Sequence, residues 1–264
     1  MIECYKLYLP KSKREIRIDV SVPRYRDNIT FDCLYMLDGQ NAFKDSKASF
    51  GRSLRATKAF SFAAREMNKR ILGIGIHNSG SDLGRINEYT PFLIDNPANQ
   101  EWESQDINIC FSFCYDFVHT IIPFIEKKYN TYNSKEHRFI YGSSLAAVTA
   151  IYLGVKYDVF GMIGAFSTAS FLFENEFYHF LDNSKLINKN IFLYVGKYEE
   201  SDDLYDNKLY YNSAINLFNY LKANKVKTRL AIDPKGEHNE ETWGNHIIDF
   251  INFIYFDDLY FFNN

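Results

Sequence analysis

The sequence predicts a single α/β domain over residues 1–264, with a mostly parallel central sheet of about eight strands and helices on both faces. Two observations predict this class. Short apolar runs alternate with segments of helical periodicity along most of the chain, which is typical of βαβ units. The 264 residues contain no internal repeat and no linker rich in Pro, Gly or Ser, and α/β folds of roughly 250 residues often form one unit.

Two kinds of strand are expected. Residues 4–9 and 15–22 alternate polar and apolar side chains, as half-exposed antiparallel strands do, and predict a hairpin at the edge of the sheet. Six later runs are almost continuously apolar, which is the pattern of strands covered on both faces. These runs are residues 31–37, 70–76, 138–141, 162–166, 191–195 and 228–232.

Five helical segments separate these strands. In one of them, apolar residues recur every three or four positions from Ile109 to Ile125, which predicts an apolar stripe packed on the sheet. Residues 77–105 are interpreted as a long loop, either a functional cover or a surface insertion. The helical segments are expected at about residues 52–68, 106–129, 145–157, 206–223 and 240–256.

Composition excludes several classes of function. With 30 Lys and Arg against 33 Asp and Glu, the formal net charge of −3 provides no basic field for nucleic acid or anionic lipid. The four cysteines match no zinc spacing and are too few for a disulfide framework. The N-terminus lacks the features of a signal peptide, and no stretch approaches eighteen uncharged apolar residues. We therefore expect a cytoplasmic protein without a metal or membrane anchor, and a homodimer is favoured if some of its 24 Phe and 20 Tyr are exposed.

A strand, a tight turn and a helix surround Ser144. The apolar residues 138–141 run into Gly142-Ser143-Ser144-Leu145-Ala146, and a helix of small and apolar residues follows. This is the G-x-S-x-G pattern of a nucleophile elbow, with Ala146 in the last place. The turn raises the central serine above the sheet edge, and we expect Ser143 to point away from the site.

A serine nucleophile requires a base, because its hydroxyl is weakly nucleophilic at neutral pH. In α/β-hydrolases the triad follows the chain order serine, acid, histidine. Of the six histidines, His238 follows the last predicted strand and precedes the last helix, so it is the predicted base. The others precede Ser144, follow it too closely, or fall within a predicted helix; they are His77, His119, His137, His179 and His246.

The acid of such a triad is expected directly after the strand at 191–195. Four carboxylates lie there, at Glu199, Glu200, Asp202 and Asp203. The acid holds the imidazole in the correct tautomer and stabilises the imidazolium. Glu199 is the first candidate, and Glu200 and Asp202 remain alternatives.

Two backbone N–H groups are expected to form an oxyanion hole. One belongs to the residue after the nucleophile, Leu145, and the other to the loop after the strand at 31–37. That strand ends in Asp38-Gly39, which is equally compatible with a plain β-turn.

Five blocks of sequence resemble the Putative esterase family, which includes esterase D-like enzymes and the catalytic domain of enterochelin esterase. The blocks run in the order of the family over about residues 31–245. They are Leu37-Asp38-Gly39-Gln40-Asn41-Ala42-Phe43, Gly73-Ile74-Gly75-Ile76-His77-Asn78, Arg85-Ile86-Asn87-Glu88-Tyr89-Thr90-Pro91, Gly142-Ser143-Ser144-Leu145-Ala146-Ala147 and Gly236-Glu237-His238-Asn239-Glu240-Glu241-Thr242-Trp243.

The resemblance implies an α/β-hydrolase fold and serine hydrolase chemistry. By position, Ser144 would be the nucleophile, His238 the base and Glu199 the acid, and Gln40 and Leu145 would supply the oxyanion N–H groups.

Further residues are expected near the substrate. The resemblance implies that Arg85, Glu88 and Tyr89 lie near the pocket, where they contact the substrate or brace the loop. Trp243 is expected on a loop near the triad. The loop at 77–105 and the region 167–187, with the rings of residues 171–180, are expected to shape the pocket, and the alternative for these rings is a place in the core.

The sequence therefore predicts a serine carboxylic-ester hydrolase that works through an acyl-enzyme and needs no cofactor. Its expected substrate is a small acyl ester: an acylated sugar, an aryl ester or a siderophore-type lactone. Acyl transfer from the same acyl-enzyme is the first alternative. A non-catalytic binding protein that retained the fold is the second.

Overall fold

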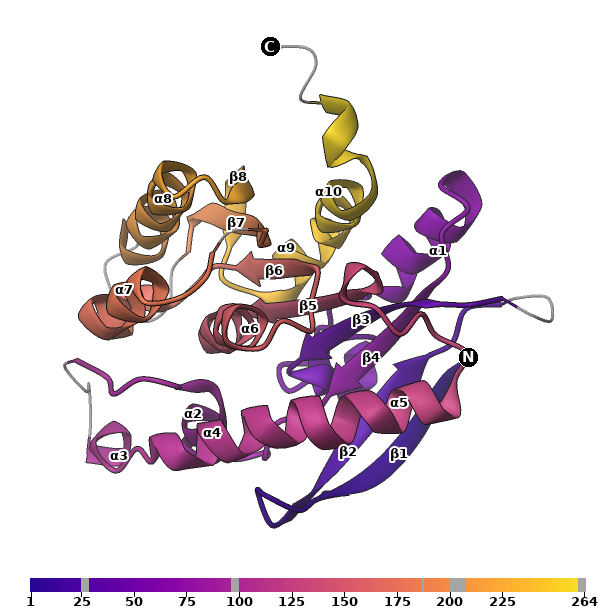
Figure 1. The fold of residues 1–264 in the computed structure, drawn as a ribbon, viewed down its shortest axis with the longest axis horizontal. Helices are drawn as coiled ribbons and strands as arrows, with labels where there is room; N and C mark the ends of the chain where they lie inside the picture. The colour runs from indigo at the N-terminus through magenta and orange to yellow at the C-terminus, as the bar shows by residue number, and fades with distance from the viewer. Residues whose placement is uncertain (25–28, 96–99, 187, 200–207, 261–264) are drawn as a thin grey trace.

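A twisted sheet of eight strands runs through the molecule (Figure 1). The structure, a computed structural model, describes residues 1–24, 29–95, 100–186, 188–199 and 208–260. The strands lie in the order β1-β2-β4-β3-β5-β6-β7-β8. β2 is antiparallel to both of its neighbours, β1 and β4, and the remaining neighbours are parallel. Their bounds are β1 Ile2–Leu9, β2 Arg14–Ser21, β3 Asp32–Leu37, β4 Ile71–Ile76, β5 Arg138–Ser143, β6 Met162–Phe166, β7 Asn190–Tyr198 and β8 Lys227–Glu237.

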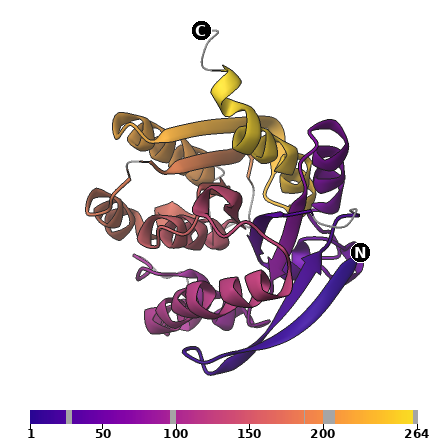
Figure 2. The ribbon, with the colours of Figure 1, turned by 45° about the vertical axis from the view of Figure 1, so that its right-hand side comes forward.

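Helices cover both faces of the sheet and enclose two apolar cores (Figure 1 and Figure 2). The larger core lies under α2 Asp82–Tyr89, α4 Ile107–Asp116, α5 Ile122–Lys128, α6 Leu145–Lys156, α7 Glu174–Asp182 and α8 Lys208–Ala223. The smaller core lies under α1 Thr57–Glu66, α9 Glu240–Asn245 and α10 Ile247–Tyr260. Short turns complete the chain: α3 Gln100–Glu103, a π turn at Phe117–Ile121, and 3₁₀ turns at Gly39–Asn41, Asp45–Lys47, Lys135–His137 and Ser170–Phe173.

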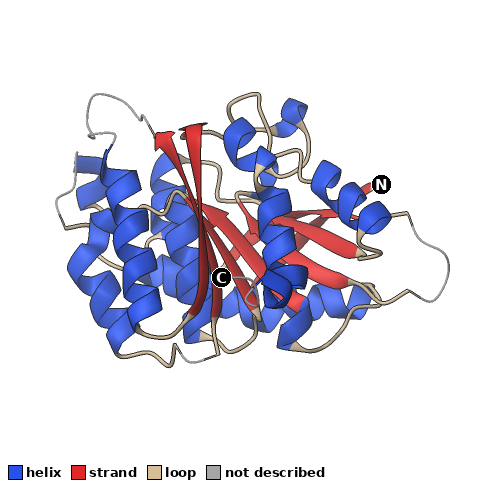
Figure 3. Ribbon diagram, turned by 90° about the horizontal axis from the view of Figure 1, so that it is seen from above, coloured by secondary structure: helices blue, strands red, loops and turns tan. Residues whose placement is uncertain are grey.

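The predicted α/β class, the eight strands and the edge hairpin are confirmed. Seen from above, the sheet is strongly twisted (Figure 3). The parallel strands from β3 to β8 bring their carboxyl ends to one rim. One strand was misjudged. β8 was expected to be covered on both faces, but as an edge strand it alternates between half-buried and exposed residues.

The helix predictions hold with four differences. α7, at Glu174–Asp182, was not predicted. The stretch read as a loop at 77–105 contains α2, which Ser81 caps by accepting a hydrogen bond from the Gly84 N–H at 3.1 Å. The helix expected at 106–129 contains the π turn. The helix expected at 240–256 is broken at His246 into α9 and α10.

One segment, Ile107–Lys128, is long and apolar enough to cross a membrane by length and composition, although none was expected. Its inner side chains pack into the larger core, among them Phe113, Phe117 and Ile121. The segment is therefore explained as a core helix of the α/β fold, whose outer face leaves Phe111 and Tyr115 partly exposed.

Candidate active site

The turn between β5 and α6 has the geometry of a nucleophile elbow. Ser144 adopts φ 59° and ψ −125°, a backbone conformation that costs a non-glycine residue about 1–3 kcal/mol. The strand and helix pass so closely that a Cβ on Gly142 would lie 2.1 Å from the Ala146 carbonyl oxygen. Glycine is thus required at position 142, whereas Ala146 fits in the last place of the motif and is fully buried. The Ser144 N–H donates to the Phe166 carbonyl at 2.9 Å, which ties the elbow to β6.

His238 directly follows β8 and is paired with a carboxylate. Its Nδ1 lies 2.6 Å from Glu199 Oε2, and because an ionised carboxylate only accepts, Nδ1 carries the shared proton. The ring lies between Tyr210, at a centroid distance of 4.3 Å, and the edge of Trp243, at 4.8 Å. These contacts fix the ring plane, and among the described residues no hydrogen bond to Nε2 is recorded.

Glu199 follows β7 and is 1% exposed. Its Oε1 accepts hydrogen bonds from the Ser167 hydroxyl at 2.5 Å and from the Gly196 N–H at 2.6 Å, while Oε2 faces His238. Three donors on two oxygens satisfy the hydrogen-bonding capacity that burial would otherwise leave unmet. Of the other predicted acids, Glu200, Asp202 and Asp203 lie outside the described residues.

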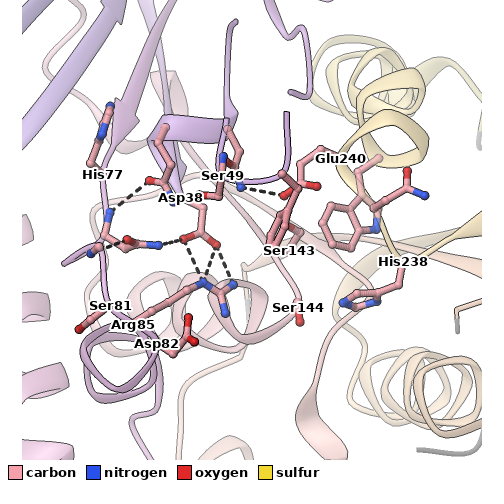
Figure 4. Close-up of a pocket in the computed structure, with 17 residues that line it drawn as sticks. Asp38, Ser49, His77, Ser81, Asp82, Arg85, Ser143, Ser144, His238 and Glu240 are labelled. Atoms are coloured by element: carbon pink, nitrogen blue, oxygen red, sulfur yellow. Dashed lines mark hydrogen bonds and ion pairs between the residues drawn. The ribbon is translucent and has the colours of Figure 1, made fainter. Parts of the chain in front are cut away.

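Ser144 and His238 open into the same cavity, which has a volume of about 830 Å³ (Figure 4). The structure records no direct hydrogen bond between the Ser144 hydroxyl and His238. In apo enzymes this bond is often long and tightens only in the complex with substrate. Gln40, Arg85 and Trp243 also line the cavity, and so does Ser143, contrary to the expectation that it points away.

The two predicted oxyanion residues lie just after two neighbouring strands, β3 and β5. Leu145 is the first residue of α6, where the N–H has no acceptor within the helix. Gln40 lies in the 3₁₀ turn that follows β3, and β3 pairs directly with β5. This turn presses against β4, because a Cβ on Gly39 would lie 2.2 Å from the Gly75 backbone.

An ion pair braces the opposite wall of the cavity. Asp38, at φ 52°, accepts from Arg85 Nη2 at 2.7 Å and from Asn78 Nδ2 at 2.7 Å (Figure 4). Burial alone would lower the pKa of Arg85, but the Asp38 carboxylate outweighs it and raises that pKa. The Asp38 N–H donates to the Tyr89 hydroxyl at 3.0 Å, so the pair fixes the start of the Gln40 turn.

Glu88 and Tyr89, which were expected near the substrate, do not line the cavity. Tyr89 is fully buried beneath Arg85, whose guanidinium lies 5.4 Å from the centre of its ring. Glu88 is 1% exposed, pairs with Arg14 and accepts from the Ser79 N–H at 2.9 Å. Burial raises the pKa of Glu88 to about 7. Both side chains brace the loop instead of lining the cavity.

The aromatic wall expected from residues 171–180 also lies elsewhere. Phe173 is buried in the larger core, and Phe171 lines a separate, smaller cavity beside α8. The main cavity is instead lined mostly by polar side chains, including Asn78, Asp82 and Glu240.

Two buried polar side chains at the site were missed by sequence reasoning. Glu240 is 8% exposed and accepts from Asn41 Nδ2 at 2.7 Å, and its burial raises its pKa. Ser167 contacts Glu199 from the end of β6. Its position directly after an apolar strand was the available signal for Ser167, since the carboxyl ends of parallel strands meet at one edge of the sheet. Among the described residues, no group of three or more His, Cys, Asp or Glu could hold a metal ion.

An α/β sheet with a serine elbow and a histidine–carboxylate pair at its carboxyl edge defines the architecture of an α/β-hydrolase. The model of the Putative esterase family matches residues 10–254, and the protein belongs to that family. It is an esterase with a mostly parallel α/β sheet. No curated protein matches the sequence.

Solved structures support the fold at low sequence identity. An IroE-like serine hydrolase from Shewanella oneidensis has a TM-score of 0.76 and 16% identity, over 95% of this chain and 79% of that one. A ferulic acid esterase has a TM-score of 0.71 and 15% identity, over 96% and 97% of the two chains. The enterobactin esterase FES from Shigella flexneri has a TM-score of 0.70 and 13% identity, over 98% of this chain and 60% of that one.

Proposed function

We propose that the protein hydrolyses carboxylic esters through a Ser144–His238–Glu199 triad and an acyl-enzyme. The observation that carries the proposal is the 2.6 Å contact between His238 and Glu199, at the cavity into which the strained Ser144 elbow opens. A loop histidine without a function has no need of a fully buried carboxylate oriented by two further donors.

The steps follow from the positions of the side chains. Ser144 attacks the acyl carbonyl while His238 Nε2 accepts its proton, and Glu199 stabilises the resulting imidazolium. The N–H groups of Leu145 and Gln40 bind the oxyanion, an interaction worth about 2.7–4 kcal/mol for one donor in related chemistry. His238 then returns the proton to the leaving alcohol, and water resolves the acyl-enzyme by the same route.

The cavity supports a small acyl group joined to a polar alcohol. Hydrogen-bonding groups line it on both sides of Ser144, including Arg85, Asn239 and Glu240. An acylated sugar or a hydroxylated lactone can form hydrogen bonds with such groups, whereas an apolar chain can form none. A purely apolar ester is therefore the least favoured substrate.

The test is hydrolysis of short-chain p-nitrophenyl esters, acetylated sugars and cyclic lactones by the wild type and by Ser144→Ala. Removal of a triad nucleophile costs about 10⁶ in kcat. Ser143→Ala is the matched control, because Ser143 lies next in the chain and lines the same cavity. An inactive wild type, or a Ser144→Ala variant that keeps its rate, would reject the proposal.

Two alternatives give different outcomes. If an alcohol replaces water, products formed with added alcohol will contain the transferred acyl group. If the fold is only a binding module, a fluorophosphonate probe will leave Ser144 unlabelled in the folded protein.

A further inference from the structure

A chain of buried hydrogen bonds reaches the proposed triad from behind its acid. The Ser167 hydroxyl lies 2.5 Å from Glu199 Oε1, and Trp243 Nε1 lies 2.9 Å from the same hydroxyl. Ser167 is fully buried and Trp243 is 4% exposed. Neither bond is part of the triad, yet the chain that the two bonds form ends on its carboxylate.

The direction of each bond is fixed by the chemistry of the groups. An indole N–H only donates, so Ser167 must accept from Trp243. A serine hydroxyl has a single proton, and an ionised carboxylate only accepts. The Ser167 proton is therefore committed to Glu199, and Trp243 keeps the hydroxyl from rotating away.

The backbone holds Ser167 rigidly for this task. Its N–H donates to the Tyr194 carbonyl at 2.7 Å, which extends the β6–β7 pairing by one residue. Its φ of 47° lies in the left-handed region, where serine is strained and glycine is not. Such strain persists where the surroundings over-determine a conformation, and it is enriched at functional sites.

Trp243 contacts both members of the pair that it supports. Its N–H reaches Glu199 through Ser167, and its ring edge packs against His238 at a centroid distance of 4.8 Å and an interplanar angle of 81°. The predicted role of Trp243 as a substrate contact does not explain the buried hydrogen bond.

We infer that Ser167 and Trp243 are positioning residues, and that their hydrogen-bond relay fixes the Glu199 carboxylate so that Oε2 orients His238. The inference rests on the proposed triad. It assigns no chemistry to either residue: both act through Glu199, and neither exchanges a proton with the substrate.

The experiment uses Ser167→Gly, Trp243→Phe and the double variant. Glycine removes the hydroxyl and suits the positive φ, while phenylalanine keeps a ring against His238 and removes the N–H. Ser170→Ala is the matched control, because Ser170 is a buried serine on the same segment that bonds Ser213 and not the triad. Ester hydrolysis gives kcat and KM, and thermal unfolding gives Tm.

We expect Ser167→Gly to lower kcat about tenfold to a hundredfold, the usual range for a hydrogen bond to a charged group, with KM little changed. Trp243→Phe should lower kcat less, because the hydroxyl remains. The double variant should be no slower than Ser167→Gly alone, since Trp243 then has nothing to orient. Losses that multiply in the double variant, or an equal loss in Ser170→Ala, would overturn the relay.

Proton NMR supplies a readout that a general loss of stability would not move. The downfield resonance of the proton between His238 Nδ1 and Glu199 should be present in the wild type and broadened or lost in Ser167→Gly at a temperature where both are folded. The chain has two tryptophans, so Trp102→Phe identifies the indole proton of Trp243, which should exchange faster in Ser167→Gly.

Labelling by a fluorophosphonate separates the two ways of failing. If the wild type is not labelled at Ser144, the proposed function fails. If the wild type is labelled and Ser167→Gly is labelled equally fast with unchanged kcat, the triad stands and the relay is wrong.

Discussion

Two buried carboxylates at the carboxyl edge of the sheet are held in different ways. Asp38, after β3, is 6% exposed and is bound by the guanidinium of Arg85 at 2.7–3.1 Å. Glu199, after β7, is 1% exposed, and its described partners are a hydroxyl, a backbone N–H and an imidazole.

Asp38 and Glu199 are both buried, so their different roles come from their different partners. A guanidinium stays protonated at any pH at which the protein is folded, so Arg85 cannot exchange a proton during a reaction. We call Asp38–Arg85 the static pair, which serves as a brace, and Glu199–His238 the responsive pair. An imidazole can gain and lose a proton, so in the proposed mechanism the field of Glu199 stabilises the charge that His238 acquires. The same rim of the sheet thus contains one static pair and one responsive pair.

The largest expected effect comes from Glu199→Gln, which breaks the responsive pair. The amide presents a donor to His238 and favours the wrong tautomer, as in other triads, where the corresponding change costs about 10⁴ in kcat. We expect a loss of about 10³–10⁴ in kcat for ester hydrolysis, with the protein still folded by circular dichroism.

The exposed Glu15→Gln variant controls for loss of a charge elsewhere on the chain and should match the wild type. A Glu199→Gln enzyme that retains more than about a tenth of kcat would show that His238 does not depend on this carboxylate, and would return the assignment to Glu200 or Asp202.

The responsive pair could be predicted from the sequence because chain order constrains it. Ser144, Glu199 and His238 each follow an apolar strand, and parallel strands bring their carboxyl ends to one rim. Local patterns were therefore sufficient to propose Ser144 and His238, but four carboxylates within five positions left the acid open. In the structure, Glu199 lies 2.6 Å from His238.

The supporting contacts could not be predicted in this way. Ser167 meets Trp243 from 76 positions away, and Arg85 meets Asp38 from 47 positions away, so neither pairing leaves a periodic signal. Gly84 and the surrounding polar residues concealed α2, whose stability comes from packing and from the Ser81 cap. The apolar composition of β8 indicated a strand but not its place at the edge.

A smaller effect, on stability, is expected from Glu88, which lies in α2 together with Arg85 of the static pair. Burial raises its pKa from 4.5 to about 7, so between these values the folded state binds more protons than the unfolded state. The stability contributed by the neutral form is fully present below pH 4.5 and is lost as the pH rises through 7. Relative to Glu88→Gln, the wild type should lose about 3 kcal/mol across this window.

Urea unfolding at pH 4.5, 6 and 7.5 measures the difference in the free energy of unfolding between the wild type and Glu88→Gln. The Glu15→Gln variant should follow the wild type at every pH, because the Glu15 carboxylate is exposed and its ion pair with Lys6 lies at the surface. If the free energy of unfolding of Glu88→Gln changes with pH in parallel with that of the wild type, Arg14 keeps Glu88 ionised throughout.

The smallest effect in this series is expected from Arg85→Gln, which breaks the static pair. Removing one member of a fully buried pair costs about 3–5 kcal/mol, but the Arg85 side chain is 28% exposed to the cavity, so we expect about 2 kcal/mol in urea unfolding. Asp38 fixes the start of the turn that contains Gln40, so loss of the ion pair should affect catalysis only by loosening this turn. We expect kcat to fall about tenfold.

Arg52→Gln is the matched control for the brace. Arg52 forms a 2.7 Å pair with Glu241, but both side chains are more than half exposed, so its loss should cost less than about 0.5 kcal/mol and leave kcat unchanged. If Arg85→Gln instead lowered kcat as far as Glu199→Gln with no loss of stability, Arg85 would contact the reacting ester itself. The distinction between a static and a responsive pair would then fail.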